Sequence, residues 1–153
     1  MNVARFLKRH FWLGFMFAYL TAALWPASFW YDPGRMAISD STVGQPVEIL
    51  YQGGARRDFI GGYTVVMRDF ETQGIVCEAH GGTFPYRPES ERPVPLTMEW
   101  WAPSDARCHR PPVGDYLTET CWKISGLLWG IVPPKNICTE PASHSVRPVQ
   151  NEG

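Results

Sequence analysis

The amino-acid sequence predicts an all-β fold, an antiparallel β-sandwich that follows a single N-terminal transmembrane helix. Three observations carry this prediction: short alternating segments, the 14 glycines and 14 prolines that punctuate them, and an uncharged stretch near the N-terminus. Glycine and proline favour turns, and an aromatic content of 14% favours strands over long helices. The same aromatic content argues against a disordered chain.

The N-terminal stretch from Phe11 to Tyr31 contains no charged residue, and it follows Arg5, Lys8 and Arg9. At 1.5 Å per residue, about 20 helical residues cross the hydrocarbon layer of a bilayer. Tryptophans near both ends of the stretch suit the two membrane interfaces. We therefore expect a cytoplasmic stub and a transmembrane signal-anchor over residues 1–31. A cleaved signal peptide is the alternative, and it delivers the same domain to the same side.

The rest of the chain has the size of one ordinary domain. Asp32-Pro33-Gly34 predicts the end of the helix and the start of a linker over residues 32–44. We expect an extracytoplasmic β-sandwich over residues 45–148 and a tail over residues 149–153. Its strands are expected at 46–52, 63–70, 74–79, 96–101, 115–124, 136–139 and 144–147.

One local stretch resembles a known family of sandwiches. Residues 112–116 (PVGDY), followed by Cys121 in the next strand, resemble the turn that enters a late strand of immunoglobulin-like and fibronectin-like domains. The resemblance implies an Ig-like sandwich. It departs from the immunoglobulin pattern because Tyr116 stands five residues before the cysteine rather than two. It implies architecture alone, since sandwich folds host many unrelated activities.

The four cysteines all lie after the apolar stretch, at Cys77, Cys108, Cys121 and Cys138. An even number of cysteines in an oxidising compartment predicts two disulfides. Of the three possible connectivities we favour Cys121–Cys138, because the last two expected strands should be neighbours, and this leaves Cys77–Cys108. Zinc bound by Cys77, Cys108 and the nearby histidines is the alternative. Its spacing matches none of the stronger zinc patterns, so we predict no metal site.

The sequence contains no motif for nucleophilic, metal-dependent or nucleotide-dependent catalysis. Ser104, Asp105 and His109 have the residue types of a catalytic triad, but nothing in their spacing predicts one. We therefore expect a protein that is not an enzyme, with no catalytic residue and no cofactor. Because the basic N-terminal segment holds no acidic residue, the rest of the chain is mildly acidic, which argues against nucleic acid as a partner.

The connection between two of the last expected strands is unusually apolar. Residues 124–132 read ISGLLWGIV, whereas loops normally lie on the surface and carry polar residues. We expect an exposed patch for a protein partner or a membrane surface, formed by Leu127, Leu128, Trp129 and Ile131. A segment that folds back to cap the open end of the sandwich is the alternative.

Two adjacent tryptophans predict a second exposed feature. Trp100 and Trp101 fall in an expected strand, where neighbouring side chains point to opposite faces of the sheet. One of them must lie on the outer face, and we expect this exposed aromatic residue to be Trp101. A proline-rich loop, a partner or a sugar ring would cover it.

These features favour a non-catalytic, membrane-anchored extracytoplasmic module that binds another protein. An accessory subunit of a membrane complex, or a bacterial or phage-encoded envelope factor, fits this description. A periplasmic ligand- or glycan-binding module is the second hypothesis, and an enzyme without a recognisable motif is the third. The expected location is the inner or plasma membrane, crossed once, with the N-terminus in the cytoplasm and the C-terminal domain in the periplasm or outside the cell.

Overall fold

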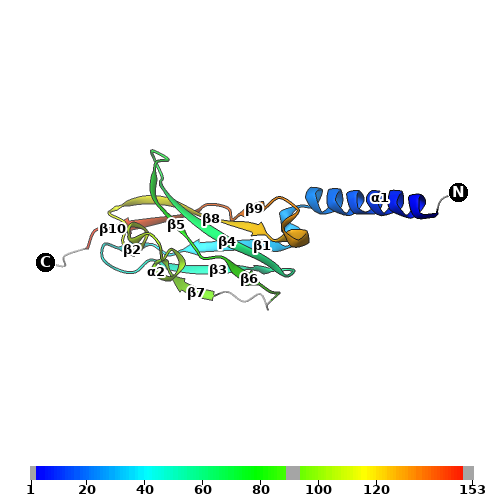
Figure 1. The fold of residues 1–153 in the computed structure, drawn as a ribbon. Helices are drawn as coiled ribbons and strands as arrows, with labels where there is room; N and C mark the ends of the chain where they lie inside the picture. The colour runs from blue at the N-terminus through cyan, green and yellow to red at the C-terminus, as the bar shows by residue number, and fades with distance from the viewer. Residues whose placement is uncertain (1–2, 89–93, 150–153) are drawn as a thin grey trace.

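The computed structural model describes residues 3–88 and 94–149, with the side chains of residues 3–9, 94, 128 and 129 outside that description. Within these residues the strands form a three-stranded sheet, β1-β3-β7, and a seven-stranded sheet whose main path is β2-β10-β8-β4-β5. The layer that holds β3 and β7 lies below the layer that holds β8 and β10 in Figure 1. The prediction of a β-sandwich-like fold is therefore confirmed.

The first four strands of the chain alternate between the two sheets. The smaller sheet is antiparallel and contains β1 (Tyr31–Ile38), β3 (Glu48–Ala55) and β7 (Val94–Thr97). The larger sheet contains β2 (Ser41–Thr42), β4 (Phe59–Asp69), β5 (Ile75–His80), β6 (Phe84–Tyr86), β8 (Gly114–Ser125), β9 (Lys135–Cys138) and β10 (Ala142–Arg147). One pair departs from the antiparallel prediction, because β2 runs parallel to β10.

Strand β8 is the centre of the larger sheet. It pairs with β4 along one edge, and with β10 and then β9 along the other. Side chains alternate along a strand, so one face of β8 is buried throughout. That face supplies much of the core with Tyr116, Thr118, Thr120, Trp122 and Ile124.

The transmembrane helix is the main error of the sequence prediction. Helix α1 spans Val3–Leu24, and none of the helices in the described residues has the length and apolar character that a membrane crossing requires. Pro26 follows the helix, and a residue before proline disfavours the helical conformation. The uncharged part of α1, residues 11–24, is about 21 Å long at 1.5 Å per residue, against a hydrocarbon layer of about 30 Å.

The last third of the uncharged stretch belongs to the sandwich instead. Ala27–Phe29 form the 3₁₀ turn η1, and Tyr31 begins β1 and is buried in the core. The predicted signal-anchor over residues 1–31 therefore covers two separate parts of the structure, helix α1 and the first residues of the sandwich. Aromatic residues that suit a membrane interface suit a protein core equally well.

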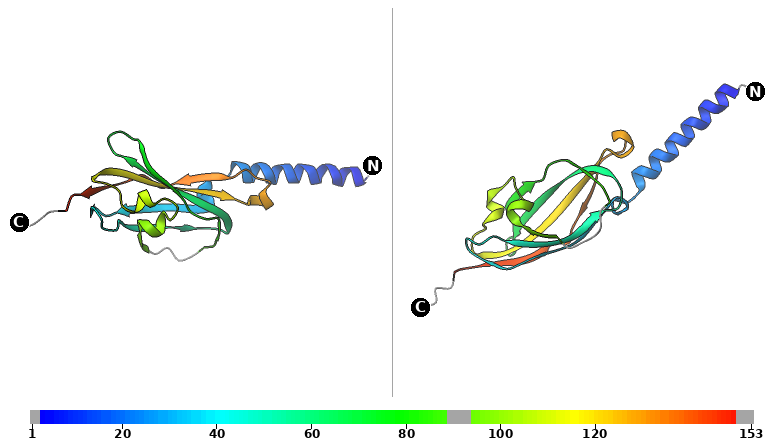
Figure 2. Two further views of the ribbon diagram at one scale, coloured as in Figure 1. Left: turned by 60° about the vertical axis from the view of Figure 1, so that its left-hand side comes forward. Right: turned by 90° about the horizontal axis from the view of Figure 1, so that it is seen from below.

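Helix α1 projects from one end of the sandwich in all three views (Figures 1 and 2). Its base is fastened by the β9 side chain of Lys135, whose Nζ donates to the carbonyl oxygen of Ala23 at 2.6 Å. The guanidinium of Arg57 lies 4.1 Å from the ring centroid of Phe29 in η1. Beyond this base, the large apolar side chains of the helix are exposed from Phe11 to Phe17.

The linker expected over residues 32–44 is instead strand β1 followed by β2. The strand register shifts between Asp32 and Arg35, so Pro33 and Gly34 form a bulge rather than a break. Gly34 has a φ of +57°, and a Cβ there would lie 1.5 Å from the carbonyl oxygen of Gln52. Glycine lets β1 continue past the bulge because it has no Cβ to clash.

Both predicted disulfides are present. Cys121–Cys138 joins directly opposed residues of β8 and β9, with a Cα–Cα distance of 3.9 Å. Cys77–Cys108 joins β5 to the short helix α3 (Ala106–His109), with a Cα–Cα distance of 5.5 Å. Because Cys77 and Cys108 are bonded to each other, neither thiolate is available for the zinc site considered from the sequence.

The turn that enters β8 carries a hydrogen bond across it. The hydroxyl of Tyr116 donates to the carbonyl oxygen of Pro112 at 2.8 Å. This contact fixes the start of β8, at the place where the sequence of residues 112–116 predicted a turn into a strand. The Ig-like strand arrangement implied by the same residues stays a prediction.

A buried histidine lies where β10 packs against the core. His144 is 3% exposed and its ring lies 5.6 Å from the ring of Tyr116. Neither ring nitrogen has a hydrogen-bond partner among the described protein groups. Burial lowers the pKa of His144, and the charge of Asp40 opposes this effect. The folded state therefore favours the neutral imidazole.

We expect acid to destabilise the fold through His144. The unfolded histidine binds a proton below its ordinary pKa of about 6.5 while the folded one resists it, so the free energy of unfolding should fall as the pH drops through that value. Urea unfolding at pH 7.5 and pH 5 measures the change. His144→Leu should show a smaller loss between the two pH values, and an equal loss in both proteins would contradict the prediction.

Candidate functional site

A cleft of about 1020 Å³ lies between the two sheets at the edge where β7 faces the larger sheet. Its walls come from both layers: β3 and β7 on one side, and β4, β8 and the segment 81–87 on the other. The short helix α2 (Met98–Trp101) forms a lip at the end of β7. The lining is dominated by aromatic rings, which are Tyr31, Tyr51, Tyr63, Phe84, Tyr86, Trp100, Trp101 and Trp122.

The deepest ring of the cleft belongs to Trp122, which is 1% exposed and lies on the inward face of β8. The ring centroid of Tyr31 lies 4.7 Å from it and that of Tyr51 5.5 Å from it. Trp101 packs against Tyr51 at 4.9 Å and against Tyr63 at 5.2 Å. Such ring pairs add about 0.5–1.5 kcal/mol each beyond the burial of their area, so the floor of the cleft is preorganised.

Hydrogen bonds fix the polar ends of three of these rings. The hydroxyls of Tyr31 and Tyr51 lie 2.6 Å apart, and the indole N–H of Trp101 donates to Thr120 Oγ1 at 2.9 Å. The rings of Tyr31, Tyr51 and Trp101 therefore have both their faces and their polar atoms constrained.

The tyrosines of the cleft stay neutral over the whole physiological range. Burial raises the pKa of Tyr86 to about 12, and it raises the pKa values of Tyr31, Tyr51 and Tyr63 as well. Desolvation favours the uncharged phenol in each case. The tyrosine side chains of the floor are consequently uncharged, and their phenolic hydroxyls give it polar groups.

Glycines make room for three of the rings. A Cβ at Gly81 would lie 2.2 Å from the ring of Tyr63, and one at Gly53 would lie 2.2 Å from the hydroxyl of Tyr51. A Cβ at Gly82 would lie 2.8 Å from the ring of Phe84. The rings lie across bare backbone at these positions, so the shape of the cleft depends on the glycines.

The rim of the cleft differs from its floor. Trp100 is 63% exposed and Phe84 is 53% exposed. Arg87 and Glu99 are the charged residues of the described lining, and both are exposed. A ligand in the cleft would meet free aromatic faces and charged groups at the rim, and only neutral groups below.

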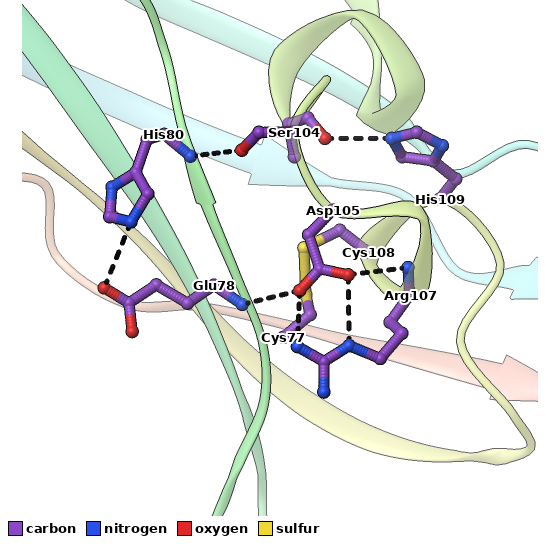
Figure 3. Close-up of a disulfide and its surroundings, with 9 residues drawn as sticks. Cys77, Glu78, His80, Ser104, Asp105, Arg107, Cys108 and His109 are labelled. Carbon is purple, nitrogen blue, oxygen red and sulfur yellow. Dashed lines mark hydrogen bonds and ion pairs between the residues drawn. A yellow bond between two sulfur atoms is a disulfide. The ribbon is translucent and has the colours of Figure 1, made fainter.

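The lip that carries the tryptophans is clamped to the edge strand β5. Besides the Cys77–Cys108 disulfide, Ser104 Oγ accepts a hydrogen bond from the backbone N–H of His80 at 2.6 Å. Asp105 Oδ2 accepts one from the backbone N–H of Glu78 at 3.2 Å, as Figure 3 shows. These contacts block outward-facing donors of an edge strand and fix the segment that follows α2.

Ser104, Asp105 and His109 have the residue types of a catalytic triad, but in the structure they hold the segment after α2 in place. Ser104 and Asp105 bind the backbone of β5, and Asp105 also accepts hydrogen bonds from Arg107, which lowers its pKa. Nε2 of His109 lies 2.8 Å from the carbonyl oxygen of Ala102. The three side chains are engaged with backbone or with Arg107 rather than with one another.

The exposed aromatic residue is Trp100, so the sequence prediction for Trp101 is wrong. The strand predicted to run through both tryptophans ends at Thr97, whose side-chain oxygen caps α2 by accepting from the backbone N–H of Trp100 at 3.4 Å. In this helical turn Trp101 faces the core and is 6% exposed.

The predicted apolar patch is only partly at the surface. Leu127 is buried, as are Ile124 and Val132 on either side of it, while Ile131 is half exposed. The side chains of Leu128 and Trp129 lie outside the described residues. Leu127 and Val132 thus follow the alternative reading, in which the segment folds back onto the sandwich beside the base of α1.

The cleft was not predicted from the sequence, although its signal is visible in hindsight. Tyr51, Tyr63 and Trp122 occupy inward positions of β3, β4 and β8, which belong to two different sheets. No family model matches the chain, and no curated protein shows a significant match to it. Among the described residues, no group of three or more His, Cys, Asp or Glu side chains is placed to hold a metal ion.

We expect Gly81→Ala to destabilise the protein by about 1–3 kcal/mol, because the added methyl group overlaps the ring of Tyr63. Urea unfolding measures the loss, and near-ultraviolet circular dichroism reports the displaced rings. Gly14→Ala in α1 is the matched control, since a Cβ there has no neighbour within 4 Å. Equal stability of the wild type and Gly81→Ala would show that the ring can move without cost.

Proposed function

We propose that this protein is a non-catalytic binding module whose aromatic cleft holds an uncharged ligand. The observation that carries the proposal is the cleft itself, a cavity of about 1020 Å³ lined by eight aromatic residues. Sites for drug-sized ligands have volumes of about 300–1,000 Å³ and are lined by apolar and aromatic groups with a few polar ones. The neutral floor and the polar rim fit that description.

The preorganisation of the cleft supports the proposal further. The ring faces, the hydrogen bonds at their polar ends and the clamp on the lip fix the walls before any ligand arrives. A preorganised site loses little conformational entropy on binding, which favours affinity. A core that served stability alone would gain nothing from exposing Trp100 and Phe84 at its rim.

The compartment we propose is oxidising and lies outside the cytoplasm. All four cysteines are paired in disulfides, and such bonds persist mainly in extracytoplasmic environments. The proposal rests on the disulfides and not on the N-terminal helix.

The indole N–H signals in a ¹H–¹⁵N nuclear magnetic resonance spectrum of the full chain test the proposal. Three uncharged ring-bearing probes are titrated separately: cellohexaose, decaproline with both termini blocked, and p-cresol. At least one should shift the signals of the cleft residues Trp100, Trp101 and Trp122, while those of Trp12 and Trp25 in the N-terminal segment serve as internal controls.

The outcome is decided within one spectrum. Shifts confined to the cleft tryptophans support a ligand site between the sheets. If none of the probes shifts them, or if the N-terminal signals shift equally, the cleft is not a ligand site.

The second candidate function is docking to a partner protein through α1. Phe11, Phe17 and Leu24 are more than two-thirds exposed, and the helix projects away from the sandwich (Figure 2). Arg5, Lys8 and Arg9 add positive charge at its far end. A partner with an apolar groove and an acidic mouth would complement both features, as in other complexes in which a helix lies in a groove.

We expect Phe11→Ser combined with Phe17→Ser to abolish partner binding without unfolding the sandwich, because both side chains lie beyond the base of the helix. Chemical cross-linking and co-purification under native expression measure the loss. Trp100→Ala is the matched control, because it removes an exposed aromatic ring elsewhere and should retain the same partner. If the wild-type protein instead sediments with phosphatidylglycerol vesicles and the helix variant does not, the helix binds lipid and the protein-docking candidate is wrong.

A further inference from the structure

The charged residues that line the cleft lie at its rim, and the floor is formed by uncharged aromatic residues. Its floor holds tyrosines that burial keeps neutral, and its charged lining residues, Arg87 and Glu99, lie at the exposed rim. A carboxylate, phosphate or ammonium group placed on the floor would lose its hydration without gaining a charged partner. The part of the ligand that enters the cleft is therefore uncharged.

The cleft is too large to have a single small cationic group as its natural ligand. A lone cation held over aromatic faces needs only a cage a few ångströms across, whereas this cavity measures about 1020 Å³. It is lined along its length by rings from Phe84 at one part of the rim to Trp100 at another. An extended ligand with several flat units fits this lining.

The strand edges on this side do not favour an extended peptide. A peptide that adds to a sheet needs a row of free backbone groups along an edge strand. Strand β7 contains Pro95, which has no N–H to offer. On β5, the N–H groups of Glu78 and His80 are already bound by Asp105 and Ser104 (Figure 3).

Sugar rings meet the remaining requirements. A pyranose with equatorial hydroxyls presents two apolar C–H faces and a polar edge. The faces can pack on exposed aromatic rings such as Trp100, and the edge can hydrogen-bond phenolic hydroxyls. At the rim, the forked guanidinium of Arg87 and the carboxylate of Glu99 are both able to bind neighbouring hydroxyl groups in pairs.

We propose that the cleft binds a neutral, unbranched oligosaccharide built from all-equatorial sugars, with Trp100 as the stacking residue at the rim. The inference rests on the proposed function and names its ligand class. In this proposal the exposed ring of Trp100 stacks on the ligand, whereas the buried rings of Trp101 and Trp122 only shape the walls of the site.

Cellohexaose and chitohexaose, titrated into the full chain, test the inference through the indole signals. At least one should shift the Trp100 signal to saturation. Trp100→Ala should weaken that binding by about tenfold, the effect of losing one aromatic face, whereas Trp12→Ala in α1 should leave it unchanged. The remaining indole signals report whether each variant is folded.

A charged analogue gives a second readout. Cellohexaose oxidised to a carboxylate at C6 of each ring keeps the ring shape and adds charge, so it should bind at least tenfold more weakly than cellohexaose. Equal binding of the two would overturn the argument from the neutral floor. Unchanged affinity of Trp100→Ala would overturn the stacking role.

The controls separate this inference from the function on which it rests. If decaproline or p-cresol shifts the cleft signals and neither oligosaccharide does, the ligand class is wrong and the cleft remains a binding site. If no probe shifts them, the binding function itself is wrong, and the oligosaccharide inference falls with it.

Discussion

The pairing of β4 with β8 is the interaction on which the rest of the structure depends. The two strands are in register from Ile60 opposite Ser125 to Asp69 opposite Tyr116, which makes this the longest pairing in the described chain. It fixes the direction in which β8 side chains alternate, and hence which of them enter the core. A shift of one residue would send Trp122 outward and Cys121 inward.

The consequences reach both layers. With Trp122 inward, the rings of Tyr31 and Tyr51 from the smaller sheet have a surface on which to pack. With Cys121 outward, the other edge of β8 can hold β9 through a disulfide. The aromatic cleft and the attachment of the chain's last strands thus follow from one register.

Local patterns were sufficient to predict most strands and both disulfides. Alternation of apolar and polar residues predicted β3, β4, β5 and β8 to within a few residues, because each has one face in the core. The pairing of Cys121 with Cys138 followed from the expectation that the last strands would be neighbours. These features depend on short segments, which the sequence displays directly.

The errors arose where a segment's structure is decided by distant contacts. Pro33 and Gly34 have the composition of a break, but the neighbouring strand β3 holds them as a bulge. The side chain of Thr97 starts a helical turn that exchanges the positions of the two tryptophans. The uncharged N-terminal stretch divides at Pro26 because Tyr31 has a place in the core. The cleft was missed because its rings come from strands that only the fold brings together.

The two disulfides differ in the face of the sheet on which they lie, and this sets the order in which a reductant can reach them. Cys77 and Cys108 are fully buried, whereas Cys121 is half-buried and Cys138 is exposed on the outer side of β8. A thiol in solution can attack the outer bond in the folded protein, but it reaches the inner one only after the sandwich opens. We therefore expect mild reduction of the folded protein to give a half-reduced form first, in which β9 is released from its covalent link to β8 while the lip of the cleft stays clamped to β5.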